Sequence, residues 1–87
     1  MRQNVDPFLY NVDTLDIHGL DRMSAIAMIK SFINDMKRID KKIFVIVHGH
    51  GEGILKKATH EYLKTDKRVL EYKLDMFNDG ETIVYLK

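Results

Sequence analysis

Two segments of the chain have the hydrophobic spacing of a helix with one buried face. Apolar residues recur three and four positions apart from Asp21 to about Arg38, which predicts a helix there. Asp21 is a suitable N-cap because its carboxylate can accept a backbone N–H from the first turn. A second helix is predicted for residues 54–65. Its expected inward face consists of Ile54, Leu55, Ala58, Tyr62 and Leu63.

Four shorter segments have the patterns of β-strands. Thr14–Ile17 alternates polar and apolar side chains, whereas Ile43–Val47 is apolar throughout, as in a central or fully covered strand. Residues 69–74 and 82–86 are two further strands, and the turn signal Asn78–Gly80 predicts that they form a hairpin. The order β-α-β-α-β-β predicts an α/β two-layer sandwich. It has a four-stranded mixed sheet, two helices on one face, and the first two strands parallel and adjacent.

The composition restricts the class of protein. The 87 residues suffice for one domain, and 45% hydrophobic with 31% charged residues is typical of a globular chain. Cysteine is absent, which excludes disulfides and a thiolate nucleophile and fits a cytoplasmic location. The longest apolar run, residues 43–47, is too short to span a membrane, so we expect no membrane partner. We divide the chain into an N-terminal arm or linker end, residues 1–13, and a domain, residues 14–87.

The net charge of +1 conceals an uneven distribution of charged residues. Residues 37–68 contain nine basic and four acidic side chains, whereas the rest of the chain contains five basic and nine acidic ones. A basic middle segment indicates a partner that carries phosphate groups. Lysines on solvated helix surfaces would give the same count, so the charge alone leaves both interpretations open.

Two motifs whose residues could bind a ligand or catalyse a reaction follow the first two predicted strands. The first, Leu15–Leu20, contains Asp16 and His18, and the second, His48–Gly53, leads directly into the second helix. The carboxyl ends of neighbouring parallel strands meet at one edge of a sheet, where open α/β sheets bind ligands. We therefore expect both motifs to contribute to a functional site at that edge.

The second motif has the composition of a phosphate-binding loop. Its three alternating glycines let backbone N–H groups approach an anion, and we expect Gly51 to need a positive φ angle. The following helix N-terminus adds positive potential, and a basic stripe with a four-residue spacing continues along that helix. A strand-to-helix turn without a ligand and a solvated helix face are the alternatives. The candidate phosphate-binding residues are Gly49, His50, Gly51, Gly53, Lys56, His60 and Lys64.

The candidate catalytic residues are Asp16, His18 and His48. Two imidazoles at equivalent strand ends suit general acid–base chemistry near neutral pH, and Asp16 can orient one of them. Alternatively, these three side chains and His50 could ligate a metal, but no further ligand pattern is present. We assign no metal ligand and keep a divalent metal as the one cofactor to be considered.

Together the two motifs resemble the signature of the Smr domain, the small MutS-related family. Leu15–Gly19 matches the family's Leu-Asp-Leu-His-Gly block, and His48–Lys56 matches its His-Gly-x-Gly-x-Gly-x-Leu-Arg/Lys block. The resemblance continues through the second helix and residues 82–86, so it covers residues 14–87. The loop of residues 76–81 departs from the family, because it is shorter and poorer in glycine than is usual there.

The resemblance implies a fold like that of the C-terminal domain of bacterial translation initiation factor three. It also implies nucleic-acid binding with nicking of DNA or cleavage of RNA, so endonuclease activity is the leading prediction. DNA repair or recombination and ribosome rescue are the implied settings. The implied partners are DNA or RNA, the ribosome, and a covalently joined MutS-like ATPase. The alternatives are a non-catalytic module that docks on structured nucleic acid or ribosomes, and an enzyme for a small phosphorylated molecule.

Overall fold

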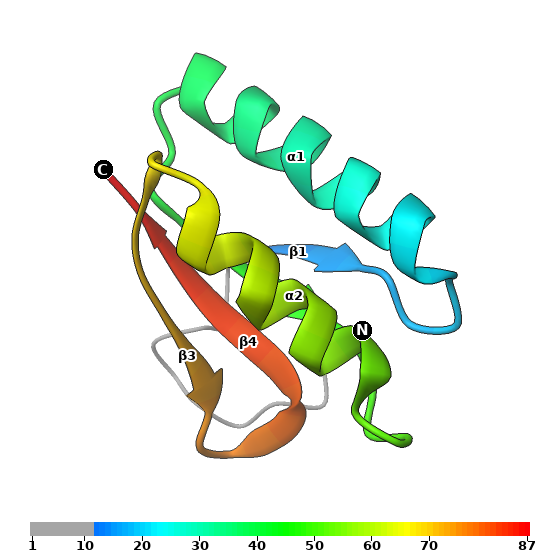
Figure 1. Cartoon of the computed structure of the whole chain (residues 1–87). Coiled ribbons are helices and arrows are strands. Elements are labelled where there is room, and N and C mark those ends of the chain that lie inside the picture. Colours follow the sequence, from blue (N-terminus) through cyan, green and yellow to red (C-terminus); the bar gives the residue numbers. More distant parts are fainter. Residues whose placement is uncertain (1–11) are drawn as a thin grey trace.

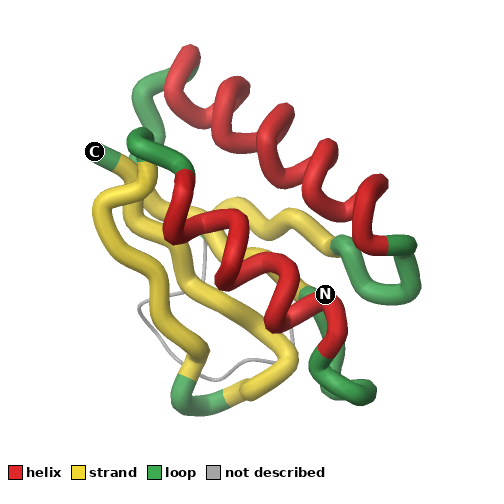
Figure 2. The backbone as a smooth tube through the Cα atoms, viewed as in Figure 1, coloured by secondary structure: helices red, strands yellow, loops and turns green. Residues whose placement is uncertain are grey.

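The two amphipathic segments form helices and the apolar segments pair in one sheet in the computed structural model, which describes residues 12–87 (Figures 1 and 2). The sheet has the order β1-β2-β4-β3, in which β1 and β2 are parallel and the other neighbours are antiparallel. The predicted α/β architecture, with its four-stranded mixed sheet, is confirmed. The elements are β1 (Asp13–Asp16), α1 (Arg22–Arg38), β2 (Ile43–Val47), α2 (Ile54–Thr65), β3 (Val69–Asp75) and β4 (Asn78–Leu86).

The core lies between the helices and one face of the sheet, and both helices cover that face (Figure 1). Strand alternation directs the buried side chains of β1, β2 and β4 toward the two helices, and the buried residues of α1 recur as predicted. The Asp21 carboxylate accepts the Ser24 N–H at 3.1 Å, which confirms the predicted N-cap. The central cluster contains Leu15, Ile29, Ile33, Phe44, Ile46, Leu63 and Val84.

Helix α2 differs from the prediction at its first turn. Ile54, expected to face inward, is 62% exposed, whereas Thr59 in the middle of the helix is fully buried. Ile54 is the first residue of α2 and lies beside the glycine-rich loop at the edge of the sheet, so no strand covers it. Ala58 and Leu63 are buried as predicted.

The β3–β4 hairpin is confirmed, but its turn lies earlier than predicted. β4 already begins at Asn78, and Met76 and Phe77 form the turn. The Asp75 carboxylate accepts the Phe77 N–H at 2.9 Å, which supplies a local turn that the spacing of Asn78–Gly80 does not reveal. The register shifts between Leu74 and Asp75, so residues 79–81 leave the β3–β4 ladder as a bulge.

The predicted N-terminal arm lies mostly outside the described residues. Asp13, which the sequence division assigned to the arm, is the first residue of β1: it pairs with Phe44, and its carboxylate contacts Lys41 Nζ at 2.9 Å. Within residues 12–87, no helix combines the length and the apolar character that crossing a membrane requires.

Candidate nucleic-acid interface

The two motifs meet at the carboxyl ends of β1 and β2. Asp16 lies opposite Val47 in the parallel ladder, and the Ile17 N–H donates to the Val47 carbonyl at 2.9 Å, one residue past the strand. This pairing brings His18 beside the glycine-rich loop, since a Cβ added to Gly49 would lie 3.4 Å from the His18 Cβ. The prediction that parallel strands bring both motifs to one edge is therefore confirmed.

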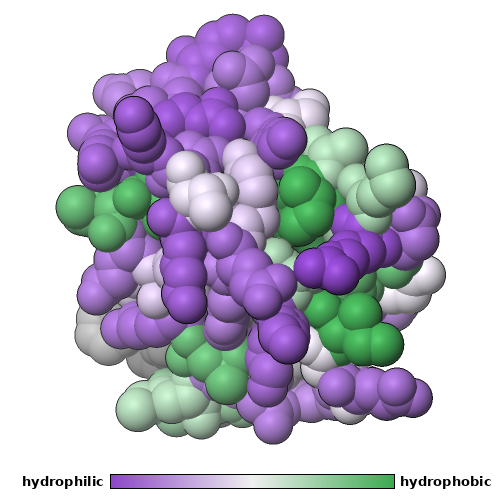
Figure 3. Space-filling view, in the orientation of Figure 1, coloured by the Kyte–Doolittle hydropathy of each residue, from purple (hydrophilic) through white to green (hydrophobic). Residues whose placement is uncertain are grey.

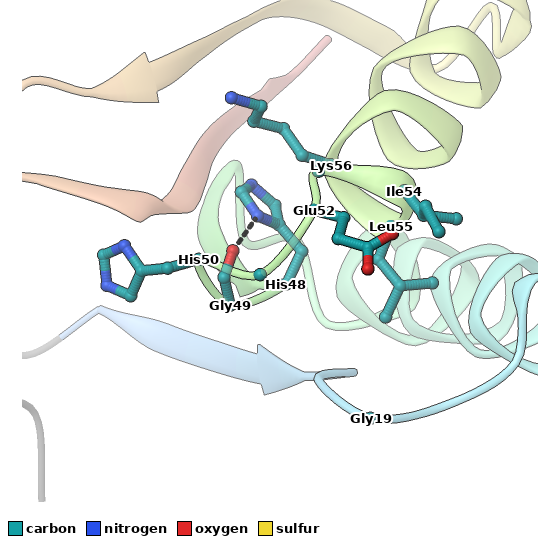
Figure 4. A pocket seen from close by; sticks show the side chains of 10 residues that line it. Gly19, His48, Gly49, His50, Glu52, Ile54, Leu55 and Lys56 are labelled. Carbon is teal, nitrogen blue, oxygen red and sulfur yellow. Dashed lines mark hydrogen bonds between the residues drawn. The ribbon is translucent and has the colours of Figure 1, made fainter.

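A shallow pocket of about 180 Å³ lies between the motifs and is lined by Gly19 and residues 48–56 (Figure 4). Gly53 is the N-cap of α2 and has a φ of +81°, but it offers no side-chain oxygen to the N–H groups of the first turn. Those N–H groups also lack acceptors within the helix, so they can bind an anion. The loop therefore has the local construction of a phosphate cradle.

Gly51 does not share the backbone conformation of the two flanking glycines. Gly49 and Gly53 have φ values of +86° and +81°, whereas Gly51 lies outside the left-handed region. The expectation of a positive φ at Gly51 is therefore wrong. A Cβ there would meet no atom within 4 Å, so the fold does not require glycine at this position. The open space above Gly51 is available to a ligand.

The charged side chains of the loop point in different directions. Figure 4 shows His50 and Glu52 on opposite sides of the loop, with Lys56 extending from α2 back over it. His50 Nδ1 contacts Asp79 Oδ1 at 2.6 Å, so this imidazole faces the bulge in β4. Among the described residues, Lys56 forms no ion pair. Its ammonium charge is therefore the one that remains available beside the pocket.

Asp16 and His18 form an exposed pair at the end of β1. His18 Nδ1 lies 2.5 Å from Asp16 Oδ1, and the His18 backbone N–H donates to the same oxygen at 3.1 Å. Burial acts to raise the pKa of Asp16, but the hydrogen bonds from His18 outweigh it and hold that pKa below its ordinary value. In the neutral ring, the ionised carboxylate favours the tautomer protonated on Nδ1, which leaves the lone pair on His18 Nε2 for proton transfer.

His48 occupies a different environment from His18, since it is only 5% exposed. Its Nδ1 lies 3.2 Å from the Gly49 carbonyl (the dashed line in Figure 4), and its Nε2 lies 2.8 Å from Thr82 Oγ1. A carbonyl can only accept, so Nδ1 carries the proton and the Thr82 hydroxyl donates to Nε2. Burial lowers the pKa of His48, and nearby positive charge, including that of Lys56, lowers it further. His48 is therefore neutral at pH 7.

His60 is not part of a solvent-facing stripe. Its Nε2 lies 2.7 Å from Thr82 Oγ1, and its ring packs against Tyr72 with centroids 5.0 Å apart. Because the Thr82 proton is donated to His48, His60 donates its own Nε2–H to Thr82. Burial lowers the pKa of His60, and Lys56 and Lys64 lower it further. Thr82 thus joins two histidines under the glycine-rich loop, a contact that its place in an apolar strand did not predict.

The candidate metal ligands do not converge. Among residues 12–87, no three His, Asp or Glu side chains are arranged to hold a metal ion. Asp16 contacts His18, His48 faces β4, and His50 contacts Asp79. The residues present therefore do not form a three-ligand protein site.

The chain belongs to the Smr domain family, whose family model matches residues 15–87. Relatives named Endonuclease MutS2 are 36% identical in Finegoldia magna and 37% in Clostridium botulinum, each over 84% of this chain. The relative of that name in Aquifex aeolicus is 31% identical over 93% of the chain. The chain spans only about a tenth of the length of these relatives, 10% or 11% in each case.

Solved structures agree with this assignment. The Smr domain of Thermus thermophilus MutS2 superposes with a TM-score of 0.84 at 26% identity, and the match covers 87% of this chain and 99% of that one. YdaL, a stand-alone small MutS-related protein from Escherichia coli, has a TM-score of 0.80 at 19% identity, covering 85% of this chain and 63% of its own. The likeness to YdaL concerns the fold alone.

Proposed function

We propose that this Smr domain binds the phosphate backbone of a nucleic acid at its glycine-rich loop and cleaves a phosphodiester there. The observation that carries the proposal is the exposed Asp16–His18 pair beside Gly49 and the start of α2. The His18 side chain starts beside Gly49, so a phosphate on the loop would be close to this residue. The endonuclease name of the relatives supports the same activity.

The size of the pocket supports a backbone phosphate over a small phosphorylated molecule. Its volume of about 180 Å³ lies below the range of roughly 300–1,000 Å³ that is typical of small-molecule sites. An extended polymer needs only a surface that receives one phosphate at a time. The positive charge of Lys56 then attracts the phosphates of the backbone.

RNA is the proposed substrate, because its 2′-hydroxyl supplies the nucleophile. His18 Nε2 takes the proton of the 2′-hydroxyl, the 2′-oxygen bonds to phosphorus, and the bond from phosphorus to the 5′-oxygen breaks. The leaving oxygen takes a proton from water, and the products are a 2′,3′-cyclic phosphate and a 5′-hydroxyl. Lys56 and the N–H groups of the loop stabilise the developing charge, and Asp16 positions His18.

Proton transfer is assigned to His18 alone and not to the predicted pair of His18 and His48. His48 is 5% exposed, and both of its ring nitrogens have partners within the protein. Its proposed role is to hold the glycine-rich loop against β4. Five expectations stay predictions: a divalent metal, a ribosomal partner, a joined MutS-like ATPase, a role in repair or recombination, and a cytoplasmic location.

The test is cleavage of RNA and DNA of one sequence by the purified chain, with and without EDTA. We expect RNA cleavage that survives EDTA and leaves a 2′,3′-cyclic phosphate, while the DNA stays intact. Cleavage that stops with EDTA and leaves a 5′-phosphate would favour metal-assisted hydrolysis instead. Salt-sensitive binding without cleavage of either substrate would favour the non-catalytic docking module.

A further inference from the structure

The turn between β3 and β4 presents hydrophobic side chains that the core does not use. Met76 is 88% exposed and Phe77 is 56% exposed, and Leu74 beside them on β3 is 37% exposed. Figure 3 shows hydrophobic surface in green at the lower end of the molecule, where Figure 1 places this turn. The Asp75 carboxylate accepts the Phe77 N–H, which stabilises the turn. Phe77 is therefore held in solvent by an ordered turn.

The bulge that follows this turn in β4 is joined to the glycine-rich loop by several contacts. The Gly80 carbonyl accepts the N–H groups of His48 at 2.9 Å and of Gly49 at 3.0 Å. His50 Nδ1 contacts Asp79 Oδ1 at 2.6 Å. Phe77 is three residues from Gly80, so their Cα atoms are at most about 11 Å apart. That distance corresponds to about three stacked nucleotides at roughly 3.4 Å each, so a strand with a phosphate on the loop is long enough to extend to Phe77.

The charges around the turn favour a base over a phosphate. Asp79 beside the turn carries a carboxylate that is 71% exposed and contacts His50, so the turn itself offers phosphate no cation. The cation available beside the pocket, Lys56, belongs to α2 and not to the turn. Phe77 and Met76 instead offer neutral, polarisable surface, and aromatic side chains stack on any base.

We propose that Phe77, flanked by Met76, stacks on an unpaired base of the nucleic acid bound at the glycine-rich loop. The domain thereby binds a single strand in preference to a continuous duplex, because paired bases are already stacked on one another. This inference rests on the proposed nucleic-acid binding and adds the class of substrate to it.

The experiment uses a tryptophan reporter, since the chain contains no Trp. Phe77→Trp should retain binding, and its fluorescence should be quenched by a single-stranded oligonucleotide but not by a duplex of the same sequence. Leu70→Trp is the matched control, because Leu70 is 67% exposed near the other end of β3 and should show no quenching. Phe77→Ala should weaken binding of the single strand by about 5- to 100-fold at fixed salt, with duplex affinity unchanged.

The outcomes separate this inference from the proposed function. Equal quenching at both reporter positions, or unchanged single-strand affinity in Phe77→Ala, would overturn the stacking while leaving backbone binding in place. Failure of the unmodified chain to bind any nucleic acid at low salt would overturn both proposals. Thermal unfolding of each variant verifies that the exposed substitutions leave the fold intact.

Discussion

Polar groups are paired with one another at the C-terminal end of helix α2, whereas they lack such partners at its N-terminal end. At the C-terminal end, the Asp66 carboxylate is only 5% exposed and accepts the Tyr62 hydroxyl at 2.5 Å. Arg68 donates to the same carboxylate from its Nε at 3.0 Å and from a terminal nitrogen at 2.8 Å. At the N-terminal end, Gly53 provides no capping oxygen, and Lys56 has no ion pair among the described residues.

This difference separates polar groups that are paired within the folded protein from polar groups that remain available to a ligand. In the Tyr62–Asp66–Arg68 network, the buried Asp66 carboxylate accepts hydrogen bonds from within the protein, so it contributes stability and is not available to a partner. The start of α2 leaves N–H groups and an ammonium group available beside an exposed Asp16–His18 pair. The location of unsatisfied groups, more than the number of lysines, therefore identifies the candidate site.

The largest expected effect is on catalysis at the N-terminal end of α2. His18→Ala should lower the single-turnover rate of RNA cleavage by at least about 100-fold, because it removes the group that accepts the proton. Affinity for a non-cleavable substrate should change little. Asp16→Asn should cost less, about tenfold, because it removes only the orientation of His18. An equal loss of rate in a folded His48→Ala variant would restore the mechanism with two histidines.

The second-largest expected effect is on the stability of the fold and concerns the C-terminal end of α2. Asp66→Asn should lower the free energy of unfolding at pH 7 by about 2 kcal/mol, measured by urea denaturation, with nucleic-acid affinity unchanged. Hydrogen bonds from Arg68 hold the pKa of Asp66 well below its ordinary value of 3.8. Its stabilisation is therefore present above about pH 4 and is lost as the pH falls through the lower, folded-state pKa.

The variant itself provides the control for this pH dependence. Other carboxylates titrate in both proteins, so the difference between the two stability curves isolates Asp66. That difference should shrink as the pH falls below 4. Parallel curves down to pH 2 would show that the Arg68 contact does not depress the Asp66 pKa.

A smaller effect separates the phosphate cradle from folding. Gly51→Val should weaken nucleic-acid binding about tenfold, the cost of losing a hydrogen bond to a charged group, while the unfolding free energy changes by less than about 1 kcal/mol. The added side chain occupies the open space above Gly51 without backbone strain. Gly53→Val is the contrasting variant, since a φ of +81° makes it destabilising by about 1–2 kcal/mol. Normal binding by folded Gly51→Val would place the anion elsewhere.

Residue spacing predicted those parts of the molecule that burial decides. One factor decides the alternation in β1, the apolar run of β2 and the helical period of α1. It is the face of each element that packs against the core. Parallel pairing of β1 and β2 then fixed the common edge of the two motifs. These features are predictable because moving a strand by one residue would expose its entire apolar face.

Local polar contacts were not predictable from the same pattern. Thr82 and His60 carry the signals of a strand residue and a surface residue, yet they meet beneath His48. The turn at Met76 and Phe77 depends on one hydrogen bond, which the Phe77 N–H donates to the Asp75 carboxylate, and the sequence offers a competing Asn-Asp-Gly turn signal. Each outcome rests on about 1 kcal/mol of local interaction, far less than the burial that sets the strands.

The smallest expected effect distinguishes a site at one end of α2 from a track along the whole helix. Lys56→Ala should weaken binding about threefold and lower the slope of log affinity against log salt by about 0.7–0.9, the loss of one phosphate contact. Lys64→Ala carries the same charge change in the last turn of α2 but should alter affinity less than twofold. The reason is His60, which faces Thr82 between the two lysines and so interrupts the basic stripe. Salt titrations of both variants by fluorescence anisotropy measure this difference. Equal losses would mean that the backbone follows the full helix face, and the contrast between the two ends of α2 would then hold for folding but not for binding.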